Sequence, residues 1–344
     1  MTILDKILEH KRQEVDYRKK VSPLDKFRPL IEYSEQSFKK ALVETKTNIV
    51  AEIKFASPSA GDFFQGYDEK KLLSTFSRIY EQRAQAISIL TDEKFFSGKD
   101  DYLKSARQMT TIPILRKDFI VDEYQIYESR FIGADAILLI VAALSDEEIR
   151  RFLKIAESLG MDALVETHTE EEIERAIKCG ASIIGINNRN LKTMKCDIST
   201  TEKLSRYVPL DKTVVSESGI ETPDDIQRLK KTADAFLIGS SLIREKKPES
   251  LLRRFSGVKV KICGLTNEED VSAAIEAGAD YLGFVFYEKS PRAISPAKCK
   301  ELIEHVKEKL NTQRNKGIRG GVTTVGVFVN APIDYVERVV KDWA

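Results

Sequence analysis

The sequence is poor in the residues that build disulfide frameworks and metal centres, and it carries almost no excess charge. Its 344 residues include only four cysteines and no CxxC pair, which excludes a disulfide scaffold and predicts reduced thiols in a cytoplasmic protein. The three histidines have no metal-ligand spacing, so we expect no metal site. The 55 basic and 54 acidic side chains leave a net charge of +1, so no nucleic-acid partner is predicted.

Long apolar runs are also missing. No stretch reaches the roughly 18–20 apolar residues that a membrane-spanning helix requires, so we expect no membrane contact. The opening residues read MTILDKILEHKRQEVDYRKK, in which charges fall in every turn and no apolar signal core is present. Hydrophobic residues make up 42% of the chain and charged residues 32%, a composition typical of a globular protein with a substantial core.

The sequence does contain a repeat of short apolar or β-branched runs, separated by segments with helical periodicity. Eight such runs come first: NIVAEIK (48–54), AISILT (86–91), IPILRKD (112–118), AILLIV (136–141), ALVET (163–167), SIIGINN (182–188), VVSES (214–218) and AFLIGSS (235–241). Apolar strands that alternate with helices are typical of a parallel sheet covered by helices. Eight units predict an α/β fold, a closed (β/α)₈ TIM barrel over residues 1–255. The residues before position 48 predict extra helices lying across one end of the barrel.

Several predicted helices carry the same start signal, a hydroxyl residue followed three positions later by an acid. The pairs are Ser145 and Glu148, Thr169 and Glu172, and Thr222 and Asp225. In a capping box the hydroxyl accepts a free N–H of the first turn, and the acid accepts the N–H of the capping residue. Two of these helices end at Gly160 and Gly180, which can adopt the left-handed conformation that follows a helix.

The same alternation starts again in the last part of the chain. Three further runs predict strands: VKVKIC (258–263), DYLGFVF (280–286) and TTVGVFVN (323–330). The first helix between them carries the start signal at Thr266 and Glu269. Because a closed barrel of this type needs eight strands, residues 258–344 predict an incomplete, three-stranded βα partial barrel.

Charged and polar side chains gather at the ends of the predicted barrel strands. Residues at the C-terminal strand ends form the active site of such a barrel, whereas deeper positions serve packing. Glu52 and Lys54 are two residues apart and therefore share one face of the first strand. Five ionisable groups and one amide would converge on the barrel mouth: Glu52, Lys54, Lys117, Glu166, Asn187 and Glu217. Singly each is explained as a solvated or structural group, but together they predict general acid–base catalysis.

Small residues follow the last two predicted barrel strands. SESGI (216–220) and IGSSL (238–242) place four candidate phosphate-binding residues in these loops: Ser218, Gly219, Gly239 and Ser240. Small side chains let backbone N–H groups approach an anion, and phosphate sites recur at this place in barrels. Glycine and serine also make ordinary turns, but two such motifs at these two strands favour a phosphorylated substrate.

These positions lie in motifs that resemble a known family. The motifs are AEIKFASPSAG (51–61), LTDEKFFSG (90–98), PILRKDFIVDEYQIYESRFIGADAILLI (113–140), LVETHT (164–169), GINNRNL (185–191), VVSESGI (214–220) and LIGSSLIR (237–244). Together they are similar to indole-3-glycerol-phosphate synthases over about residues 1–255. The resemblance implies conversion of 1-(2-carboxyphenylamino)-1-deoxyribulose 5-phosphate to indole-3-glycerol phosphate, with release of CO₂ and water, in tryptophan biosynthesis. It also implies that the reaction uses neither a metal nor a cofactor.

The resemblance also implies roles for the residues at the strand ends. Lys117 or Lys54 protonates the ketone so that the aromatic carbon can attack it, and which lysine acts first stays open. Glu166 works in the dehydration as acid or base, while Glu52 and Glu217 orient the lysines. These roles fit the chemistry, since ring closure needs a proton donor at the carbonyl and dehydration needs a proton remover nearby.

Further positions are implied to bind the substrate. They are Ser57, Phe96, Phe119, Leu138 and Arg189. Arg189 would hold the substrate carboxylate with its planar guanidinium, and Asn187 would hold polar groups. The two phenylalanines and the leucine would line a slot for the anthranilate ring, and Ser57 would close over the ligand. His168, just past Glu166, is interpreted as a loop or cap residue.

The last part of the chain resembles a second family. KICGLTNEEDVSAAIEAGADYLGFVFYEKSPRAISP (261–296) is similar to the start of phosphoribosylanthranilate isomerases. The resemblance implies that Cys263 is a general base and that Arg292 grips anthranilate, whereas the partner acid of that family sits on a later strand. We therefore expect residues 258–344 to be inactive alone, and either to pair with a separately encoded remainder of the barrel or to represent a truncated gene product.

Two alternatives to the synthase remain open from the sequence. Another phosphate-sugar enzyme of the same fold could use Lys54 or Lys117 to form a Schiff base, which borohydride would trap. A non-catalytic protein could instead use residues 258–344 as an assembly component of a tryptophan-pathway complex. Its size in solution would then depend on that segment.

Overall fold

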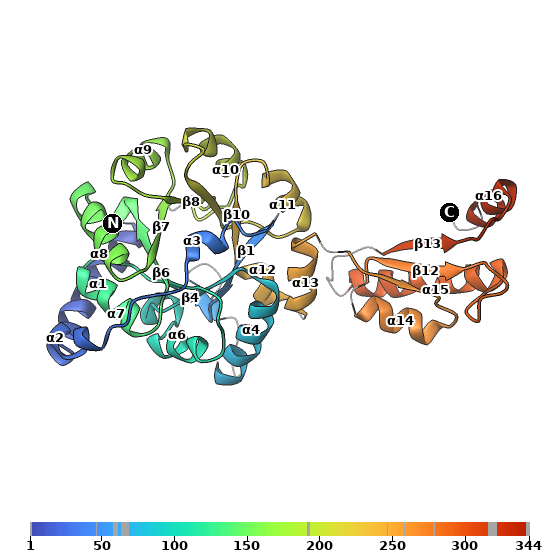
Figure 1. The fold of residues 1–344 in the computed structure, drawn as a ribbon, viewed down its shortest axis with the longest axis horizontal. Coiled ribbons are helices and arrows are strands. Elements are labelled where there is room, and N and C mark those ends of the chain that lie inside the picture. The colour runs from blue at the N-terminus through green and yellow to red at the C-terminus, as the bar shows by residue number, and fades with distance from the viewer. Residues whose placement is uncertain are drawn as a thin grey trace. The chain divides into compact units, whose positions relative to one another are not determined.

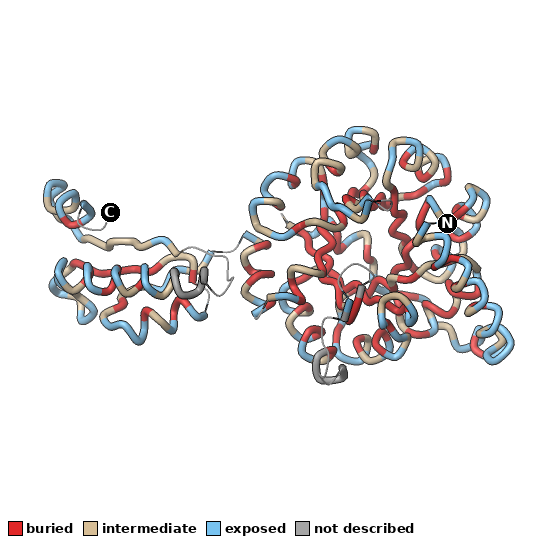
Figure 2. Tube along the Cα trace, turned by 180° about the vertical axis from the view of Figure 1, so that it is seen from behind, coloured by how far each residue is buried: buried red, intermediate tan, exposed pale blue. Residues whose placement is uncertain are grey.

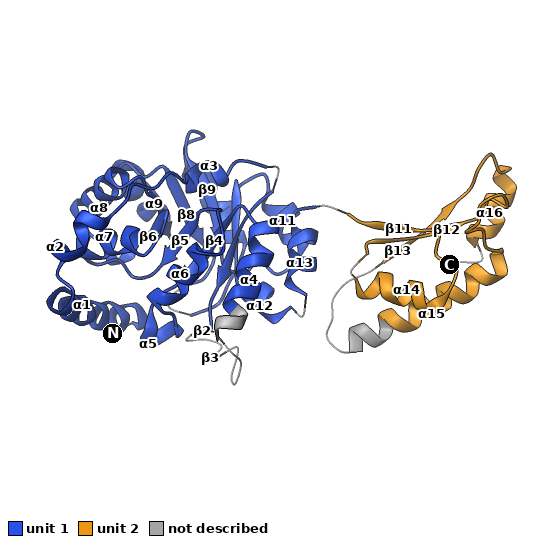
Figure 3. Ribbon diagram, turned by 60° about the horizontal axis from the view of Figure 1, so that its bottom comes forward, with its two compact units in different colours: residues 1–257 blue, residues 258–344 orange. Residues whose placement is uncertain are grey.

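The computed structural model describes residues 2–45, 47–57, 61–62, 69–190, 193–245, 247–257, 259–277, 279–315 and 322–341. The chain divides into two compact units, residues 1–257 (unit 1) and residues 258–344 (unit 2), which Figure 3 colours separately. None of the helices in the described residues has both the length and the apolar character needed to cross a bilayer.

Unit 1 contains a closed barrel of parallel strands in the order β1-β10-β9-β8-β7-β6-β5-β4. The strands are β1 (Asn48–Ile53), β4 (Ala86–Leu90), β5 (Ile114–Lys117), β6 (Ala136–Ile140), β7 (Asp162–Thr167), β8 (Ile183–Asn187), β9 (Thr213–Glu217) and β10 (Ala235–Ile238). β1 pairs with β4 on one side and with β10 on the other, which closes the barrel. Each of the eight predicted runs forms one of these strands, so the predicted TIM barrel is confirmed (Figure 1).

Helices surround the barrel between successive strands (Figure 1). The longer ones are α4 (Glu69–Arg83), α6 (Asp100–Arg107), α7 (Glu123–Phe131), α8 (Asp146–Ser158), α9 (Glu170–Lys178), α10 (Ser199–Leu204), α11 (Pro223–Leu229) and α13 (Pro248–Phe255). The connections also hold α5 (Glu93–Phe96), α12 (Ser240–Arg244), the 3₁₀ turns η2 (Val141–Ala143) and η3 (Ser205–Tyr207), and the short antiparallel pair β2 (Ala56–Ser57) and β3 (Gly61–Asp62).

The N-terminal segment covers both ends of the barrel rather than one. It forms α1 (Ile3–Val21), α2 (Leu24–Phe27), η1 (Arg28–Leu30) and α3 (Phe38–Ala41). Phe38 of α3 and Leu42 belong to the core cluster inside the barrel, and the Lys39 backbone N–H donates to Asp162 at the start of β7. This places α3 at the N-terminal ends of the strands. The residues of α1, in contrast, reach the opposite end, where the strands terminate.

The barrel has a core on each side of its wall, because side chains alternate along every strand. In β1, Ile49 and Ala51 pack outward in the cluster that includes Leu73 of α4, whereas Val50 packs inward with Leu164 of β7. The buried segments in Figure 2 follow the strands of unit 1. This wall is a rigid support for side chains at the strand ends.

The predicted helix ends are confirmed in part. Full capping boxes form at Ser145 and at Thr222, and the glycines at 160 and 180 have φ of +74° and +97°. Thr169 caps α9 by accepting the Glu172 N–H, but the Glu172 carboxylate does not complete the box. That carboxylate instead accepts the backbone N–H of His168 at 2.6 Å.

Unit 2 is a three-stranded parallel sheet with helices and a core of its own. The strands β11 (Lys261–Cys263), β12 (Tyr281–Val285) and β13 (Thr323–Val327) lie in the order β11-β12-β13, with α14 (Glu268–Glu276), α15 (Pro296–Asn315) and α16 (Ile333–Lys341). Leu282 and Phe284 of β12 pack with Leu302 of α15. The predicted capping box at Thr266 is wrong: the cap lies one residue later, because Asn267 is extended and accepts the Asp270 N–H.

Candidate active site

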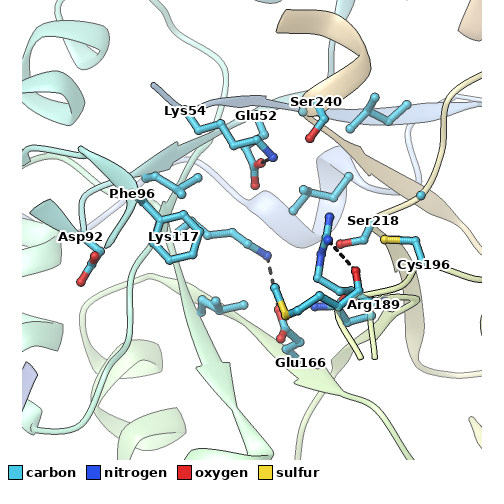
Figure 4. Close-up of a pocket in the computed structure, with 18 of the residues that line it drawn as sticks. Glu52, Lys54, Asp92, Phe96, Lys117, Glu166, Arg189, Cys196, Ser218 and Ser240 are labelled. Carbon is cyan, nitrogen blue, oxygen red and sulfur yellow. Dashed lines mark hydrogen bonds and ion pairs between the residues drawn. The ribbon is translucent and has the colours of Figure 1, made fainter. Parts of the chain in front are cut away.

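A cavity of about 250 Å³ lies in unit 1 where the barrel strands end. Its lining includes residues from the ends of several strands and from the loops that follow them (Figure 4). They include Glu52, Lys54, Lys117, Glu166, Asn187, Arg189, Ser218, Gly219, Gly239 and Ser240. The structure therefore brings most of the predicted site residues to one concave surface.

Glu52 and Lys54 form an ion pair at the end of β1. The alternation of the strand directs both side chains to the barrel mouth, and Lys54 Nζ lies 2.8 Å from Glu52 Oε1. Burial would raise the pKa of Glu52, but the charges of Lys54 and Lys117 outweigh it and lower that pKa below its usual range. Glu52 is therefore ionised at neutral pH and holds Lys54 in place.

Lys117, the last residue of β5, is the centre of the charged cluster. Its ammonium group contacts the Glu217 carboxylate and lies 3.4 Å from Glu166 Oε2. Burial alone would lower the pKa of Lys117, but the surrounding carboxylates, with Glu217 first, raise it instead. The amine is consequently held in its charged form.

The two glutamates beside Lys117 have opposite pKa shifts. The pKa of Glu166 is lowered, because Lys117, His168 and a hydrogen bond from Asn187 outweigh its burial. Burial raises the pKa of Glu217 to about 7, helped by the charge of Glu166 and only partly opposed by Lys117. At neutral pH one of these neighbouring carboxyls is therefore ionised while the other is partly protonated, which is how a base and an acid for general acid–base catalysis are set apart.

Asn187 and Arg189 place polar groups beside the cluster at the end of β8. Asn187 Oδ1 accepts the backbone N–H of Arg189 at 3.0 Å, and its side chain is also hydrogen-bonded to Glu166. Arg189 Nη1 donates to the carbonyl oxygen of Met194 at 3.1 Å, which orients the guanidinium (Figure 4). An arginine fixed in this way can receive a carboxylate.

The opposite part of the cavity is apolar. The rings of Phe96 and Phe119 lie 6.0 Å apart, and Leu138 and Ile140 of β6 line the same space. This combination of two aromatic rings and branched side chains forms a slot that suits a planar ring.

The loops after β9 and β10 have the backbone that an anion site needs. Ser218 and Gly219 both have positive φ, +67° and +79°, and Gly239 is the N-cap of α12. A Cβ on Gly239 would lie 2.4 Å from Glu52 Oε1, so only glycine lets the loop approach the cluster this closely. The first N–H groups of a helix have no acceptor within the helix and can therefore bind an anion.

Comparison with known proteins identifies both parts of the chain. The family model "Indole-3-glycerol phosphate synthase" matches residues 4–255, and the model "N-(5'phosphoribosyl)anthranilate (PRA) isomerase" matches residues 260–344. The chain belongs to the indole-3-glycerol phosphate synthase family. Both predicted resemblances are thereby confirmed.

The relatives of this synthase chain are of two kinds. "Tryptophan biosynthesis protein TrpCF" of Vibrio parahaemolyticus is 40% identical over 98% of the chain, which covers 67% of that relative. "Indole-3-glycerol phosphate synthase" of Thermoanaerobacter is 45% identical over 70% of the chain and 92% of the relative. The solved 3-hexulose-6-phosphate synthase of Salmonella typhimurium shares the fold alone, with a TM-score of 0.50 and 11% identity over 61% of the chain and 97% of that structure.

Some predicted residues are not among those that line the synthase cavity. Glu217 contacts Lys117 but is not part of the lining. The side chain of Ser57 lies outside the described residues. Cys263 and Arg292 are in unit 2, where Arg292 Nη1 donates to the Cys263 carbonyl oxygen at 3.1 Å. Gly264 has φ of +83°, and a Cβ there would lie 2.7 Å from Arg292 Cδ. The base and the arginine expected of an isomerase therefore lie side by side at the end of β11.

The structure also adds residues to the synthase cavity that the sequence did not indicate. Ile3, Leu4 and Ile7 of α1 line it, and so do Met194 and Cys196. The residues of α1 carry no signal in the sequence, because α1 precedes the first barrel strand, whereas Met194 and Cys196 lie in the loop after β8, where site residues are expected. Within the described part of the chain, no three His, Cys, Asp or Glu side chains are grouped so that they could hold a metal ion.

A buried ion cluster fixes α1 over the cavity. Lys11 Nζ lies 3.0 Å from Asp92 Oδ2, from Asp118 Oδ1 and from Glu14 Oε2. The Lys11 side chain is 1% exposed; Asp92 lies two residues past the end of β4, and Asp118 directly follows β5. The apolar residues at the start of α1 are thereby held against the cavity.

Proposed function

We propose that the cavity of unit 1 converts 1-(2-carboxyphenylamino)-1-deoxyribulose 5-phosphate to indole-3-glycerol phosphate. The observation that carries the proposal is the placement of Lys117 between Glu166 and Glu217, inside a cavity edged by the two glycine–serine loops. A proton donor, a proton acceptor and a phosphate-binding loop are thus within reach of one small molecule.

The substrate has three parts that fit three parts of the cavity. Its phosphate would bind the backbone N–H groups of Ser218, Gly219, Gly239 and Ser240, with Lys54 supplying positive charge. Its anthranilate ring would lie in the slot of Phe96 and Phe119, and its carboxylate would pair with Arg189. Leu138 would complete the slot, and Ser57 would contribute from the loop after β1.

Ring closure would be catalysed by Lys117 as general acid. Lys117 Nζ donates a proton to the ketone oxygen while the aromatic carbon bonds to the carbonyl carbon. CO₂ then leaves, and the electrons of the broken C–C bond return to the ring. Lys117 suits this role because its neighbouring carboxylates keep it as an ammonium ion. The same charge makes it a poor Schiff-base nucleophile.

Dehydration would follow at Glu166. The new hydroxyl leaves as water after accepting a proton, and a proton is removed from the adjacent ring carbon, so that the indole becomes aromatic. Glu166 carries one of these transfers, while Glu52 and Glu217 hold the lysines and Asn187 holds Glu166. The raised pKa of Glu217 supplies a second carboxyl that is partly protonated at neutral pH.

The proposal is tested by the fluorescence of indole-3-glycerol phosphate formed by the intact chain. We expect product from the wild type and a loss of about 10²–10⁴-fold in kcat/KM for Lys117→Met and Glu166→Gln. Lys178→Met is the matched control, because this exposed lysine pairs with an exposed glutamate on α9, away from the cavity lining. The proposal is wrong if the wild type forms no product or if Lys117→Met retains full activity.

For unit 2 we propose that residues 258–344 do not by themselves isomerise phosphoribosylanthranilate. The base and the arginine lie together at Cys263 and Arg292, but the isomerase family takes its partner acid from a strand later than the three described. We propose that these residues need the remaining strands of such a barrel, from the same polypeptide or from another, to be active. Rapid isomerase turnover by residues 1–344 without those strands would contradict this.

A further inference from the structure

His168 lies between the predicted catalytic carboxylate and the first turn of α9. It directly follows β7, and its side chain is 12% exposed. His168 Nε2 is 3.5 Å from Glu166 Oε1, and His168 Nδ1 is 3.3 Å from Glu172 Oε2. The imidazole thus separates a carboxylate that lines the cavity from one that belongs to a surface helix.

The two ring nitrogens have different surroundings. Glu172 Oε2 accepts the His168 backbone N–H and also lies within hydrogen-bond distance of His168 Nδ1. These two interactions with one oxygen fix the orientation of the ring. Nε2 is buried and has no hydrogen-bond partner within the described residues. A hydrogen on Nδ1, directed at Glu172, leaves the Nε2 lone pair facing Glu166.

Glu172 connects this arrangement to solvent. Its side chain is 18% exposed, whereas that of Glu166 is 7% exposed. The order Glu166, His168, Glu172 is therefore a chain of titratable groups that runs from the buried cavity wall to the surface.

The proposed reaction needs such a connection. The substrate loses its carboxylate as neutral CO₂ and its hydroxyl as neutral water, so charge balance requires the uptake of one proton in each turnover. Glu166 also changes its protonation state during dehydration and must return to its starting form before the next substrate binds.

We infer that His168 is a positioning residue that relays protons between Glu166 and solvent, with Glu172 orienting its ring. The outward step starts from the tautomer with hydrogen on Nδ1: protonated Glu166 gives its proton to Nε2, and Nδ1–H passes its proton to Glu172. The inward step starts from the other tautomer: Nε2–H gives its proton to Glu166 Oε1 while Glu172 passes a proton to Nδ1. Each step conserves protons and converts one tautomer of the ring into the other, so the ring returns to the Nε2–H tautomer before each further inward transfer. This inference rests on the proposed synthase function and deepens it.

The charges around the ring suit a relay near neutral pH. Burial would lower the pKa of His168, but the hydrogen bond to Glu172 and the charge of Glu166 raise it above its usual value. Glu217 of β9 acts in the same direction from farther away. Lys117 lies 3.4 Å from Glu166 Oε2. Of the elements that pack against α9, η2 is apolar, Asp146 of α8 pairs with Arg175, and Arg206 of η3 donates to Tyr207.

The test compares His168→Gln and His168→Ala with the wild type in the synthase assay from pH 5.5 to 9. Glutamine keeps a donor near the position of Nε2 but cannot titrate, and alanine leaves space for added imidazole. His305→Gln is the matched control, because His305 is another partly exposed histidine, hydrogen-bonded to Ser272 in unit 2. Circular dichroism melting checks that each variant is folded.

We expect kcat to fall roughly tenfold in both His168 variants, with KM within about twofold, less than the 10²–10⁴-fold of a primary acid–base group. Imidazole should restore kcat in His168→Ala only, and the acidic limb of the kcat profile should change in His168→Gln. The relay would be overturned if both His168 variants kept the wild-type kcat across the pH range. It would also be overturned if kcat fell but imidazole did not restore it in His168→Ala and the pH profile of His168→Gln stayed unaltered.

A second measurement does not depend on turnover. The C2–H resonance of His168 gives its pKa directly, and Glu172→Gln and Glu166→Gln should each lower that pKa. If neither variant changes it, the coupling inferred from the distances is absent and the relay is wrong. If the titration behaves as expected but the wild type forms no indole product, the proposed function fails instead.

Discussion

Replacing Lys117 with methionine removes the positive charge at the centre of the site and keeps the length of the side chain. Besides the loss of activity, this change should have a large effect on stability. The side chains of Glu217 and Glu166 are only 1% and 7% exposed, so water cannot replace the lost ammonium group. Removing one partner of a buried ion pair costs about 3–5 kcal/mol. For a unit of this size we expect a fall in Tm of about 10 °C, from about 2–4 °C per kcal/mol.

The size of the effect should depend on pH. Without Lys117 the buried carboxyls lose the charge that opposed their desolvation, so their pKa values rise in the folded state. A group with a raised folded pKa contributes stability that is complete below its unfolded pKa and is lost as pH rises through the folded value. The penalty should therefore be small near pH 5 and should grow toward pH 8, by at most about 1.4 kcal/mol per pH unit for each extra proton bound.

The assay is urea unfolding followed by far-ultraviolet circular dichroism. Lys117→Met is compared with Glu217→Gln and with Lys117→Met/Glu217→Gln, and Lys178→Met is the surface control. Glutamine removes the unpaired charge, so the double variant should regain at least about 1 kcal/mol.

The reasoning would be refuted by a penalty that is the same at pH 5 and pH 8. It would also be refuted if the effects of the two substitutions were additive to within about 0.5 kcal/mol, since residues in one ion cluster should be coupled. Either result would mean that Lys117 and Glu217 are not the interacting pair that their contact indicates.

Three further predictions concern the rim of the site. Arg189→Lys should raise KM roughly tenfold with little change in kcat, because the fixed guanidinium binds the substrate carboxylate in the ground state and transition state alike; steady-state kinetics measure this. Gly239→Ala should weaken competitive inhibition by inorganic phosphate and lower kcat/KM, since its Cβ would displace Glu52. Lys11→Met should lower Tm by about 10 °C at pH 7. In the wild type, Lys11 and Arg116 hold the pKa of Asp118 well below its usual range. Without Lys11 that carboxyl can be protonated as pH falls, so the loss in Tm should be smaller at pH 4.5 than at pH 7. Calorimetry at these two pH values checks this.

The barrel could be predicted because its signals are local. Each strand is a nearly continuous apolar run, since both of its faces are buried, and the helices between the strands carry caps at Ser145 and Thr222. The site followed from the same information, because the C-terminal ends of parallel strands must meet. Glu52 and Lys117 are 65 positions apart in the sequence, and only the closed topology brings them to one cavity.

The features that could not be predicted are those set by packing between distant segments. Lys11 looks like one more charge on an amphipathic helix, and only the docking of α1 turns it into a buried partner of Asp92 and Asp118. The capping box at Thr169 is incomplete for a related reason. Its acid, Glu172, had an alternative partner in His168, which a pattern of spacings does not weigh.

The charges of the site have to satisfy two opposed needs. Three carboxylates are required to hold two buried ammonium groups rigidly, but three negative charges would repel a substrate that carries a phosphate and a carboxylate. The burial of Glu217 resolves the conflict, because its pKa of about 7 lets one carboxyl become neutral near physiological pH. With Glu217 protonated, Lys54 and Lys117 balance Glu52 and Glu166, and Arg189 leaves an excess positive charge for the anionic substrate. We therefore expect the same carboxyl to position Lys117 when ionised and to lessen the repulsion of the substrate when neutral.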